Sequence, residues 1–423
     1  MNLQQALDYM LTPGGPKTRL GLERITELME KLGNPQKMLR FVHVAGTNGK
    51  GSTCAMLSAI LTRAGYTTGL YTSPHLFRVN ERMKINGVDI TDEELIELAE
   101  QVKPVTDRME DEPTEFERIT AMALLYFQKR KCDVVVLEVG LGGRLDSTNV
   151  IDAPDAAVIT NIALEHTQLL GYTLEKIARE KAGIIKENTP VALYGQSQEV
   201  EQVVQKICQE KGGRLWVSAP ERVQVEYSSL HGQSVSYRAR ENLKLPLLGA
   251  HQAYNMALVL DTVDLLVRER GYHISDEAIR DGLSAVTWPG RLEVLQKSPT
   301  VLVDGAHNPD GVQQLAAAVN QYLPGQKITF VMGVMADKHY VEMAGMVAPY
   351  AKQFITVAPE YHRALDAESL REIIEHKLHV TARCGGSVQQ GLELALTESG
   401  PEDTIVVFGS LYQVGEVRAW FGK

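Results

Sequence analysis

The residues best suited to chemistry follow a short apolar stretch near the N-terminus. Phe41–Ala45 is apolar and rich in β-branched residues, as a buried strand requires. It runs into GTNGKGS, residues 46–52, and then into a segment whose apolar residues recur at helical spacing. Glycines let backbone N–H groups approach phosphate oxygens closely, and a helix N-terminus adds positive potential. This strand, glycine loop and helix therefore predict a phosphate site for a nucleotide.

Within the loop, Lys50 is placed to reach the β- and γ-phosphates, and the Ser52 hydroxyl can face Mg²⁺ or phosphate. We expect the nucleotide to contact Asn48, Gly49, Lys50, Gly51 and Ser52. The spacing departs from the common Walker A pattern, because Gly51 stands between the lysine and the serine. A glycine-rich turn that binds nothing is the alternative, and the strand-to-helix context favours nucleotide binding.

Strands and helices alternate around this loop. Strands are expected at 67–71, 132–139, 156–162 and 190–194, with helices between them, after two N-terminal helices broken at 11–16. This alternation is typical of a doubly wound parallel sheet, in which ligands collect at the carboxyl ends of the strands. Residues 214–248 instead alternate in polarity like a small β-hairpin.

A second α/β cycle begins near residue 292. Its expected strands are 300–304, 328–332, 353–357 and 404–408. We therefore predict an α/β protein with two domains: a large Rossmann-like P-loop ATPase domain with a parallel sheet, residues 1–295, and a smaller C-terminal α/β domain, residues 296–423.

Composition narrows the classes of function. The 423-residue chain has a net charge of −10, which argues against a general nucleic-acid binder. Its four cysteines form no metal-ligand spacing and fit a reducing compartment. The N-terminus lacks the basic start and apolar core of a signal peptide, and no apolar run approaches a membrane span. We expect a soluble cytoplasmic protein with no nucleic-acid or membrane partner.

Three polar residues at expected strand ends are candidate ligands for Mg²⁺. They are Ser73, Glu138 and His166. Glu138 lies in an apolar strand, where an unpaired carboxylate is costly to bury, so a cation is needed nearby. That cation is either a metal ion or a Lys or Arg side chain. For His166, the alternative is a hydrogen-bonded core histidine.

The glycine-rich segment 139–149 follows a buried strand. Its three glycines allow close approach of a ligand, and Asp146 could accept two hydrogen bonds from an amino-heterocycle such as a pterin. The alternative is an Asx turn built by Asp146, Ser147 and Asn149, and spacing alone favours that alternative.

Two further strand-to-helix turns lie in the second cycle. In DGAHNP, Asp304 could hold a ribose hydroxyl and His307 would face the same crevice. The alternative is a helix capped by Asn308 with Pro309 in the first turn. In FGSLY, Ser410 stands at a helix start that suits carboxylate binding.

Taken together, the motifs resemble one family. HVAGTNGKGS, YTSPHL, LEVGLGGRLDSTN, EKAGI, WPGR, DGAHNP and FGSLY occur in the family's order between about residues 19 and 418. The chain is similar to the Mur ligase superfamily and, within it, to the folylpolyglutamate and dihydrofolate synthases. The resemblance implies a Rossmann-like ATPase domain joined to a smaller glutamate-binding domain, with ATP in the cleft between them.

The resemblance also implies roles for individual residues. ATP would be held by the phosphate loop together with Asn255, Arg291 and Asp304, and the magnesium ligands would be Ser73, Glu138 and His166. Lys181 in EKAGI matches a lysine that is carbamylated in the family, and the alternative for it is an exposed helical lysine. A monovalent cation could accompany Mg²⁺. Lys50, Lys181 and His307 would act in catalysis, and His307 and Ser410 would meet glutamate. Folate or dihydropteroate would contact Leu20, Gly21, Leu22, Thr114, Glu115, Phe116, Glu117, Leu145, Asp146 and Ser147.

The implied activity is ATP-driven addition of L-glutamate to folate, and also to dihydropteroate, through an acyl phosphate. The enzyme is expected to act as a monomer. Two rival interpretations remain: another Mur-type ligase acting on a cell-wall precursor, and a regulatory P-loop switch that binds nucleotide without forming bonds. The first shares the ATP motifs but not LGGRLDSTN or FGSLY, and the second would not need DGAHNP in a second domain.

Overall fold

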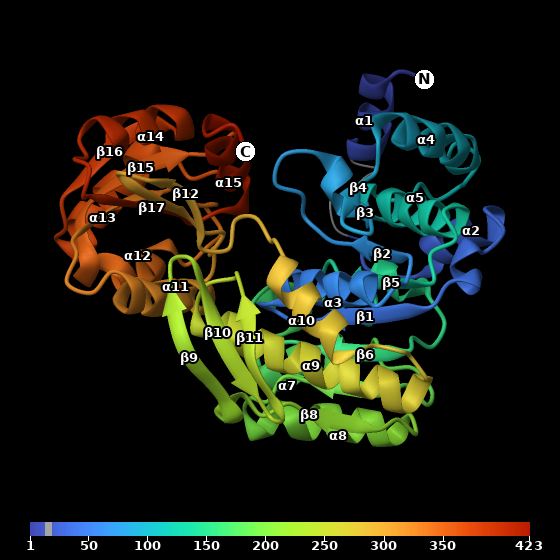
Figure 1. Cartoon of the computed structure of the whole chain (residues 1–423). Coiled ribbons are helices and arrows are strands. Elements are labelled where there is room, and N and C mark those ends of the chain that lie inside the picture. The colour runs from blue at the N-terminus through green and yellow to red at the C-terminus, as the bar shows by residue number, and fades with distance from the viewer. Residues whose placement is uncertain (13–18) are drawn as a thin grey trace. The chain divides into compact units, whose positions relative to one another are not determined.

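The computed structural model describes residues 1–12 and 19–423 and divides them into two compact units (Figure 1). The first contains Met1–Val223, Tyr237–Ala239 and Tyr254–Val286, and the second contains Gln224–Ser236, Arg240–Ala253 and Thr287–Lys423. Of the expected helix break at 11–16, residues 13–16 lie outside the described residues. The functional division that we place at residue 295 stays a prediction.

The first unit is built on an eight-stranded sheet of order β4-β3-β2-β5-β1-β6-β7-β8. The strands from β2 to β8 in this order are mutually parallel, as predicted, while β3 and β4 add an antiparallel edge. The bounds are β1 Phe41–Ala45, β2 Thr68–Tyr71, β3 Met83–Ile85, β4 Val88–Asp89, β5 Val134–Glu138, β6 Ala156–Ile159, β7 Val191–Leu193 and β8 Leu215–Val217.

Helices cover this sheet and bury apolar side chains against it. One apolar cluster is formed largely by α1, α2, α4 and α5, and another by α7 and α8 with the strands they cover. The bounds are α1 Leu3–Leu11, α2 Glu23–Lys31, α3 Lys50–Arg63, α4 Asp92–Thr106, α5 Glu115–Lys129, α6 Thr167–Leu170, α7 Leu174–Ala182, α8 Gln198–Glu210, α9 Ala250–Arg270 and α10 Asp276–Ala285. Gly282 in α10 lets this helix lie against α3, since a Cβ there would fall 2.6 Å from the Ile60 Cα.

The expectation of a simple hairpin over residues 214–248 is wrong in two respects. Leu215–Val217 joins the large sheet as β8, because it pairs in parallel with β7. The remainder forms a three-stranded sheet, β9 Val223–Ser229, β10 Gly232–Tyr237 and β11 Arg240–Leu245. Three short strands with half-exposed faces carry the same alternating pattern as two, so pattern alone could not count them.

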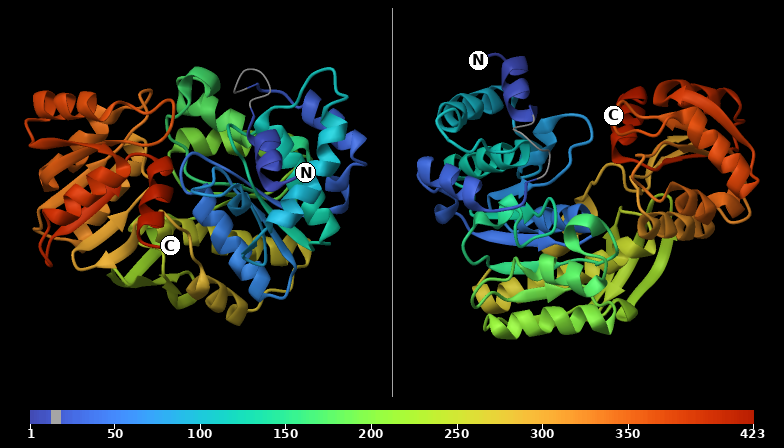
Figure 2. Two further views of the ribbon diagram at one scale, coloured as in Figure 1. Left: turned by 90° about the horizontal axis from the view of Figure 1, so that it is seen from above. Right: turned by 180° about the vertical axis from the view of Figure 1, so that it is seen from behind.

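The second unit contains a six-stranded sheet of order β12-β13-β17-β14-β15-β16. All neighbours are parallel except β12 and β13. Helices α11 to α13 pack on one another and α14 packs on α15, so that helices cover both faces (Figure 1 and Figure 2). The bounds are β12 Glu293–Lys297, β13 Thr300–Val303, β14 Ile328–Met332, β15 Ala351–Ala358, β16 Ala382–Ser387, β17 Thr404–Phe408, α11 Pro309–Tyr322, α12 Tyr340–Val347, α13 Ala367–Leu378, α14 Val388–Thr397 and α15 Leu411–Trp420.

Sequence reasoning located the four central strands of this sheet and missed both edges. Edge strand β16 reads ARCGGS and lacks an apolar run, and β12 alternates over only five residues. Edge strands are covered less than central ones, so their sequences carry a weaker apolar signal. No helix in the described part of the chain combines the length and apolar character needed to cross a bilayer.

Candidate active site

The predicted nucleotide-binding and metal-binding residues lie at the carboxyl ends of four neighbouring strands of the first unit. In sheet order these strands are β2, β5, β1 and β6, and they run parallel. Ser73 follows β2, Glu138 ends β5, the glycine loop follows β1, and His166 follows β6. Parallel neighbours present their carboxyl ends on the same side, where α/β sheets bind ligands.

The glycine loop is held by the strand beside it. Thr160 after β6 donates from its hydroxyl to the Asn48 carbonyl at 2.8 Å, and the Thr47 N–H donates to the Asn161 carbonyl at 2.7 Å. Gly46 has no room for a side chain, since a Cβ there would lie 1.7 Å from the Thr160 Oγ1. These contacts fix the loop's backbone where a phosphate would need it.

Two lysines converge on one carbonyl of this loop. Lys50 Nζ donates to the Gly46 carbonyl at 3.0 Å and to the Thr47 carbonyl at 3.0 Å. Lys181, from α7, donates to the same Gly46 carbonyl at 2.7 Å although it lies 135 residues away in the chain. Burial, followed by the nearby Lys50 charge, lowers the pKa of Lys181 to about 7. Both the charged and the neutral form of the Lys181 amine are therefore accessible near neutral pH. The alternative of an exposed helical lysine is wrong, because the side chain is buried.

Asn255 reaches the same loop from α9. It is buried, and a Cβ on Gly49 would lie 2.7 Å from its Oδ1. Gly49 adopts a left-handed φ of 86° immediately before α3 begins at Lys50. A side chain at position 49 would therefore strain the backbone and displace Asn255.

The candidate magnesium ligands share this sheet edge. The Ser73 N–H donates to the Glu138 Oε2 at 3.0 Å, and Glu138 is buried. His166 adopts a left-handed backbone with φ 50° at the start of α6. Hydroxyl and carboxylate oxygens suit Mg²⁺, which usually keeps water and phosphate oxygens as further ligands. Among the described residues no three His, Cys, Asp or Glu side chains enclose a metal site by themselves, so phosphate and water would have to complete the shell.

The glycine-rich segment after β5 forms the Asx turn given above as the alternative. Asp146 Oδ1 accepts from the Thr148 N–H at 3.0 Å, and its Oδ2 accepts from the Leu141 N–H at 2.8 Å. Burial raises the pKa of Asp146, although these hydrogen bonds oppose the shift. The side chain thus shapes its own loop, and contact of Leu145, Asp146 and Ser147 with a substrate stays a prediction.

The second predicted substrate segment begins α5 and also has a structural role. Thr114 and Glu117 form a capping box, and the buried Glu117 Oε2 accepts from Arg24 Nε at 3.0 Å. Phe116 packs against Tyr71 at 6.1 Å and occupies the space that a side chain on Gly140 would need. The segment is therefore adjacent to the glycine-rich loop, whereas Glu115 lies 3.7 Å from Arg82. Leu20, Gly21 and Leu22 lead into α2, and Leu20 is exposed.

Replacing Glu117 with alanine is expected to destabilise the protein strongly. The change removes the buried carboxylate that pairs with Arg24, leaves Arg24 with the exposed Asp111, 3.6 Å away, as its acidic partner, and opens the cap of α5. Removal of one partner of a buried pair costs about 3–5 kcal/mol. Thermal unfolding should show a clear fall in Tm. The exposed Glu97 on α4 offers a control, since Glu97→Ala should change the Tm little. Equal Tm values for both variants would contradict the structural role of the pair.

The second unit gathers its predicted residues around the ends of β13 and β17, which are neighbours. Asp304 accepts from the Leu292 and Ala306 N–H groups at 2.7 Å each, and burial raises its pKa against the opposing Arg291 charge. His307 Nδ1 donates to the Gly305 carbonyl at 2.8 Å, so its Nε2 carries the lone pair when the ring is neutral. Ser410 caps α15, accepting from the Tyr412 N–H at 3.2 Å.

The helix-cap interpretation of the DGAHNP turn is also confirmed. Asn308 accepts from the Gly311 N–H at 2.8 Å and Pro309 occupies the first turn of α11. Contact of Asp304 and His307 with a ligand stays a prediction.

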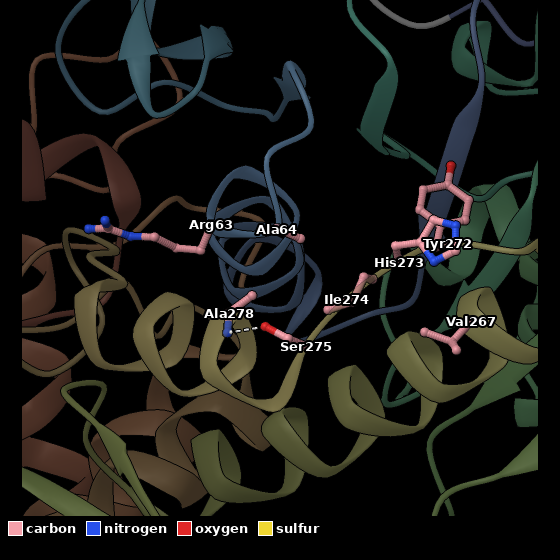
Figure 3. Close-up of a pocket in the computed structure, with 8 residues that line it drawn as sticks. All are labelled: Arg63, Ala64, Val267, Tyr272, His273, Ile274, Ser275 and Ala278. Atoms are coloured by element: carbon pink, nitrogen blue, oxygen red, sulfur yellow. Dashed lines mark hydrogen bonds between the residues drawn. The ribbon is translucent and has the colours of Figure 1, made fainter.

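A separate pocket of about 420 Å³ lies elsewhere on the first unit (Figure 3). It is lined by residues at the C-terminal end of α3 and around the connection from α9 to α10, namely Arg63, Ala64, Val267, Tyr272, His273, Ile274, Ser275 and Ala278. The phosphate loop is at the other end of α3, about 20 Å away for a helix of this length. The pocket contains no residue of the predicted site.

Sequence reasoning missed three residues that support this site. Thr160 braces the phosphate loop, and the buried pair His43 and Thr148 contacts Asp146. Each lies within or beside a motif singled out above, but a polar residue in a buried strand or turn gives no sign of its partner. Pairing across strands β1 and β6, which the sequence leaves open, brings Thr160 to the loop.

The chain matches two domain families, the Mur ligase middle domain over residues 44–263 and the Mur ligase glutamate ligase domain over residues 290–411. It is 38% identical over 420 residues to a dihydrofolate synthase/folylpolyglutamate synthase of Bacillus subtilis, covering 94% of each chain. Two solved structures are similar. E. coli FolC in complex with DHPP and ADP gives a TM-score of 0.88 at 33% identity, covering 100% of this chain and 98% of that one. Mycobacterium tuberculosis folylpolyglutamate synthase complexed with ADP gives a TM-score of 0.91 at 30% identity, covering 100% of this chain and 98% of that one. By its domains, its coverage and its motifs, the chain belongs to the Mur ligase family and, within it, to the folylpolyglutamate and dihydrofolate synthases.

Proposed function

We propose that this protein is an ATP-dependent ligase that adds L-glutamate to folate and also to dihydropteroate. The observation that carries the proposal is the convergence of Lys50, Lys181 and Asn255 on the glycine loop, beside Ser73 and Glu138. Relatives of this chain bear both synthase names, and the E. coli neighbour was solved with DHPP and ADP. We further propose that the enzyme acts as a monomer.

The two units divide the substrates between them in this proposal. Residues of the first unit hold the ATP phosphates and the pteroyl substrate, the latter through 20–22, 114–117 and 145–147. In the second unit, Arg291 and Asp304 contact ATP, while His307 and Ser410 bind glutamate. The hydrogen bond from His307 Nδ1 to the Gly305 carbonyl supports this role, because it fixes the orientation of the His307 ring within the turn.

The reaction couples a carboxylate to an amine, and a carboxylate is a poor electrophile. The substrate carboxylate attacks the γ-phosphorus of ATP, forming an acyl phosphate and releasing ADP. The glutamate amine then attacks the activated carbonyl, phosphate leaves, and an amide remains. Catalysis consists mainly of positioning and charge neutralisation, with Lys50 stabilising the transferring phosphoryl group. No side-chain nucleophile is required.

Mg²⁺ would be held by Ser73, Glu138 and His166, where it would neutralise phosphate charge. Lys181 fits a carbamate at this position. Carbamylation requires a neutral amine, and the pKa of Lys181 is lowered to about 7. The carbamate would also place an anion beside the Lys50 ammonium at the Gly46 carbonyl, where the two opposite charges attract and the carbamate offers oxygen ligands.

An assay with separate substrates tests the function. Purified protein with ATP, Mg²⁺ and L-glutamate is given dihydropteroate, a reduced folate monoglutamate or a UDP-muramyl substrate, and products are scored by mass. Addition of one glutamate mass to a pteroyl compound is the expected result. Product only from the UDP-muramyl substrate would favour the cell-wall ligase, and nucleotide binding without product would favour the regulatory switch.

A further inference from the structure

Three buried side chains of the first unit form a continuous hydrogen-bonded chain behind the glycine-rich loop. His43, in the middle of β1, places its Nε2 2.9 Å from the Thr148 Oγ1. The Thr148 Oγ1 lies 2.5 Å from the Asp146 Oδ1. His43 and Thr148 are fully buried and Asp146 is 4% exposed. Neither His43 nor Thr148 has any part in the reaction described above.

The donors and acceptors fix the direction of the hydrogen bonds from His43 through Thr148 to Asp146. Asp146 accepts hydrogen bonds at both oxygens, from two backbone N–H groups and from Thr148, as an ionised carboxylate does. The Thr148 hydroxyl therefore donates to Asp146 and must accept from His43. This requires the proton of His43 to sit on Nε2. Its buried Nδ1, which has no hydrogen-bond partner among the described residues, is then the unprotonated nitrogen.

Asp146, at the other end of this series of hydrogen bonds, controls the backbone of the loop. Asp146 Oδ2 accepts from the Leu141 N–H, and this hydrogen bond joins the two ends of the segment 141–146. Asn149 adds a second tie, donating to the Arg144 carbonyl and to the Gly183 carbonyl after α7. Phe116 packs against Gly140 at the start of the segment. The conformation of the loop beside Phe116 thus depends on how Asp146 is held.

We infer that His43 and Thr148 are positioning residues for the pteroyl substrate: their hydrogen-bonded chain orients Asp146 and with it the 141–146 loop. The inference rests on the proposed function, since it requires this loop to meet the pteroyl group. Neither residue contacts the substrate itself. Loss of the chain weakens pteroyl binding and leaves the phosphate loop, held separately by Thr160, unchanged.

A pair of substitutions at Thr148 separates positioning from packing. Thr148→Val keeps the shape and removes the hydroxyl, so the KM for dihydropteroate or folate should rise about tenfold or more while the KM for ATP changes less than about twofold. Thr148→Ser keeps the hydroxyl and should restore the KM. Thr262→Val removes another buried hydroxyl, which donates to Leu258 in α9 at 2.8 Å, and should leave both KM values unchanged.

A second measurement needs no variant to fold. Nitrogen-15 NMR of labelled histidines should show His43 as the neutral Nε2–H tautomer, with no protonation between about pH 5.5 and 9, because burial lowers its pKa to about 3.

His43→Gln, which can still donate from the Nε2 position, should retain more pteroyl affinity than His43→Leu.

The outcomes are distinguishable. Wild-type protein that adds glutamate to pteroyl compounds, with Thr148→Val showing an unchanged pteroyl KM or equal rises in all KM values, overturns the positioning role alone. An Nδ1–H tautomer at His43 overturns it as well. Wild-type protein that never extends a pteroyl compound overturns the proposed function, and this inference falls with it.

Discussion

Replacing Lys50 with alanine is expected to lower glutamate-dependent phosphate release about a thousandfold or more, with the fold retained. The Lys50 ammonium is held over the loop by two carbonyls, and its charge meets the phosphoryl group as negative charge develops. Phosphate release is measured with the pteroyl substrate, ATP and L-glutamate, and circular dichroism and thermal unfolding report the fold.

The matched control for this variant is Lys37→Ala. Lys37 is exposed and lies before β1, so its loss changes the net charge equally without touching the loop. Turnover should remain close to that of the wild type. If Lys50→Ala turns over normally, Lys50 has no place in the mechanism.

Replacing Lys181 with alanine should abolish most activity, and small carboxylates such as acetate should restore part of it. The substitution removes the amine that would carry the carbamate, and an added carboxylate can supply the missing anionic oxygens in the cavity left behind. The same rates are measured with and without the added acid. Lys176→Ala, an exposed lysine of the same helix α7, serves as control and should behave as the wild type.

Carbon dioxide gives a direct readout of this carbamate. Protein labelled with ¹³CO₂ should show one carbamate signal that Lys181→Ala lacks. The neutral amine is the reactive form, so occupancy should rise as pH increases through about 7, the lowered pKa of Lys181, and fall below it. Full activity of Lys181→Ala, or a signal that persists in it, would refute the carbamate.

Several features could be predicted from the sequence because their information is local. The order GTNGKGS after an apolar strand indicates a phosphate loop, since glycine positions and helix spacing lie within one short segment. The central strands of both sheets were predicted for the same reason, as buried parallel strands are continuous apolar runs. The edge strands β12 and β16 lack such runs and were missed.

The roles of some carboxylates could be assigned only from the residues that contact them in the structure. From spacing alone, Asp146 favoured an Asx turn over a ligand contact, and Glu117 was assigned to the substrate only by the family resemblance. The structure shows Asp146 closing its own turn and Glu117 paired with Arg24, 93 residues away. Both contacts restrict how these carboxylates can be used for a substrate.

The sequence by itself determined the family, the α/β class and the residues of the phosphate loop, because these follow from contiguous motifs and the periodicity of apolar residues. Only the tertiary structure decided which distant side chains share a position. Lys181 meets Lys50 at the Gly46 carbonyl, and His43 meets Asp146 through Thr148. The physical reason is that strand order and burial, rather than separation along the chain, bring these groups together and set the pKa of Lys181.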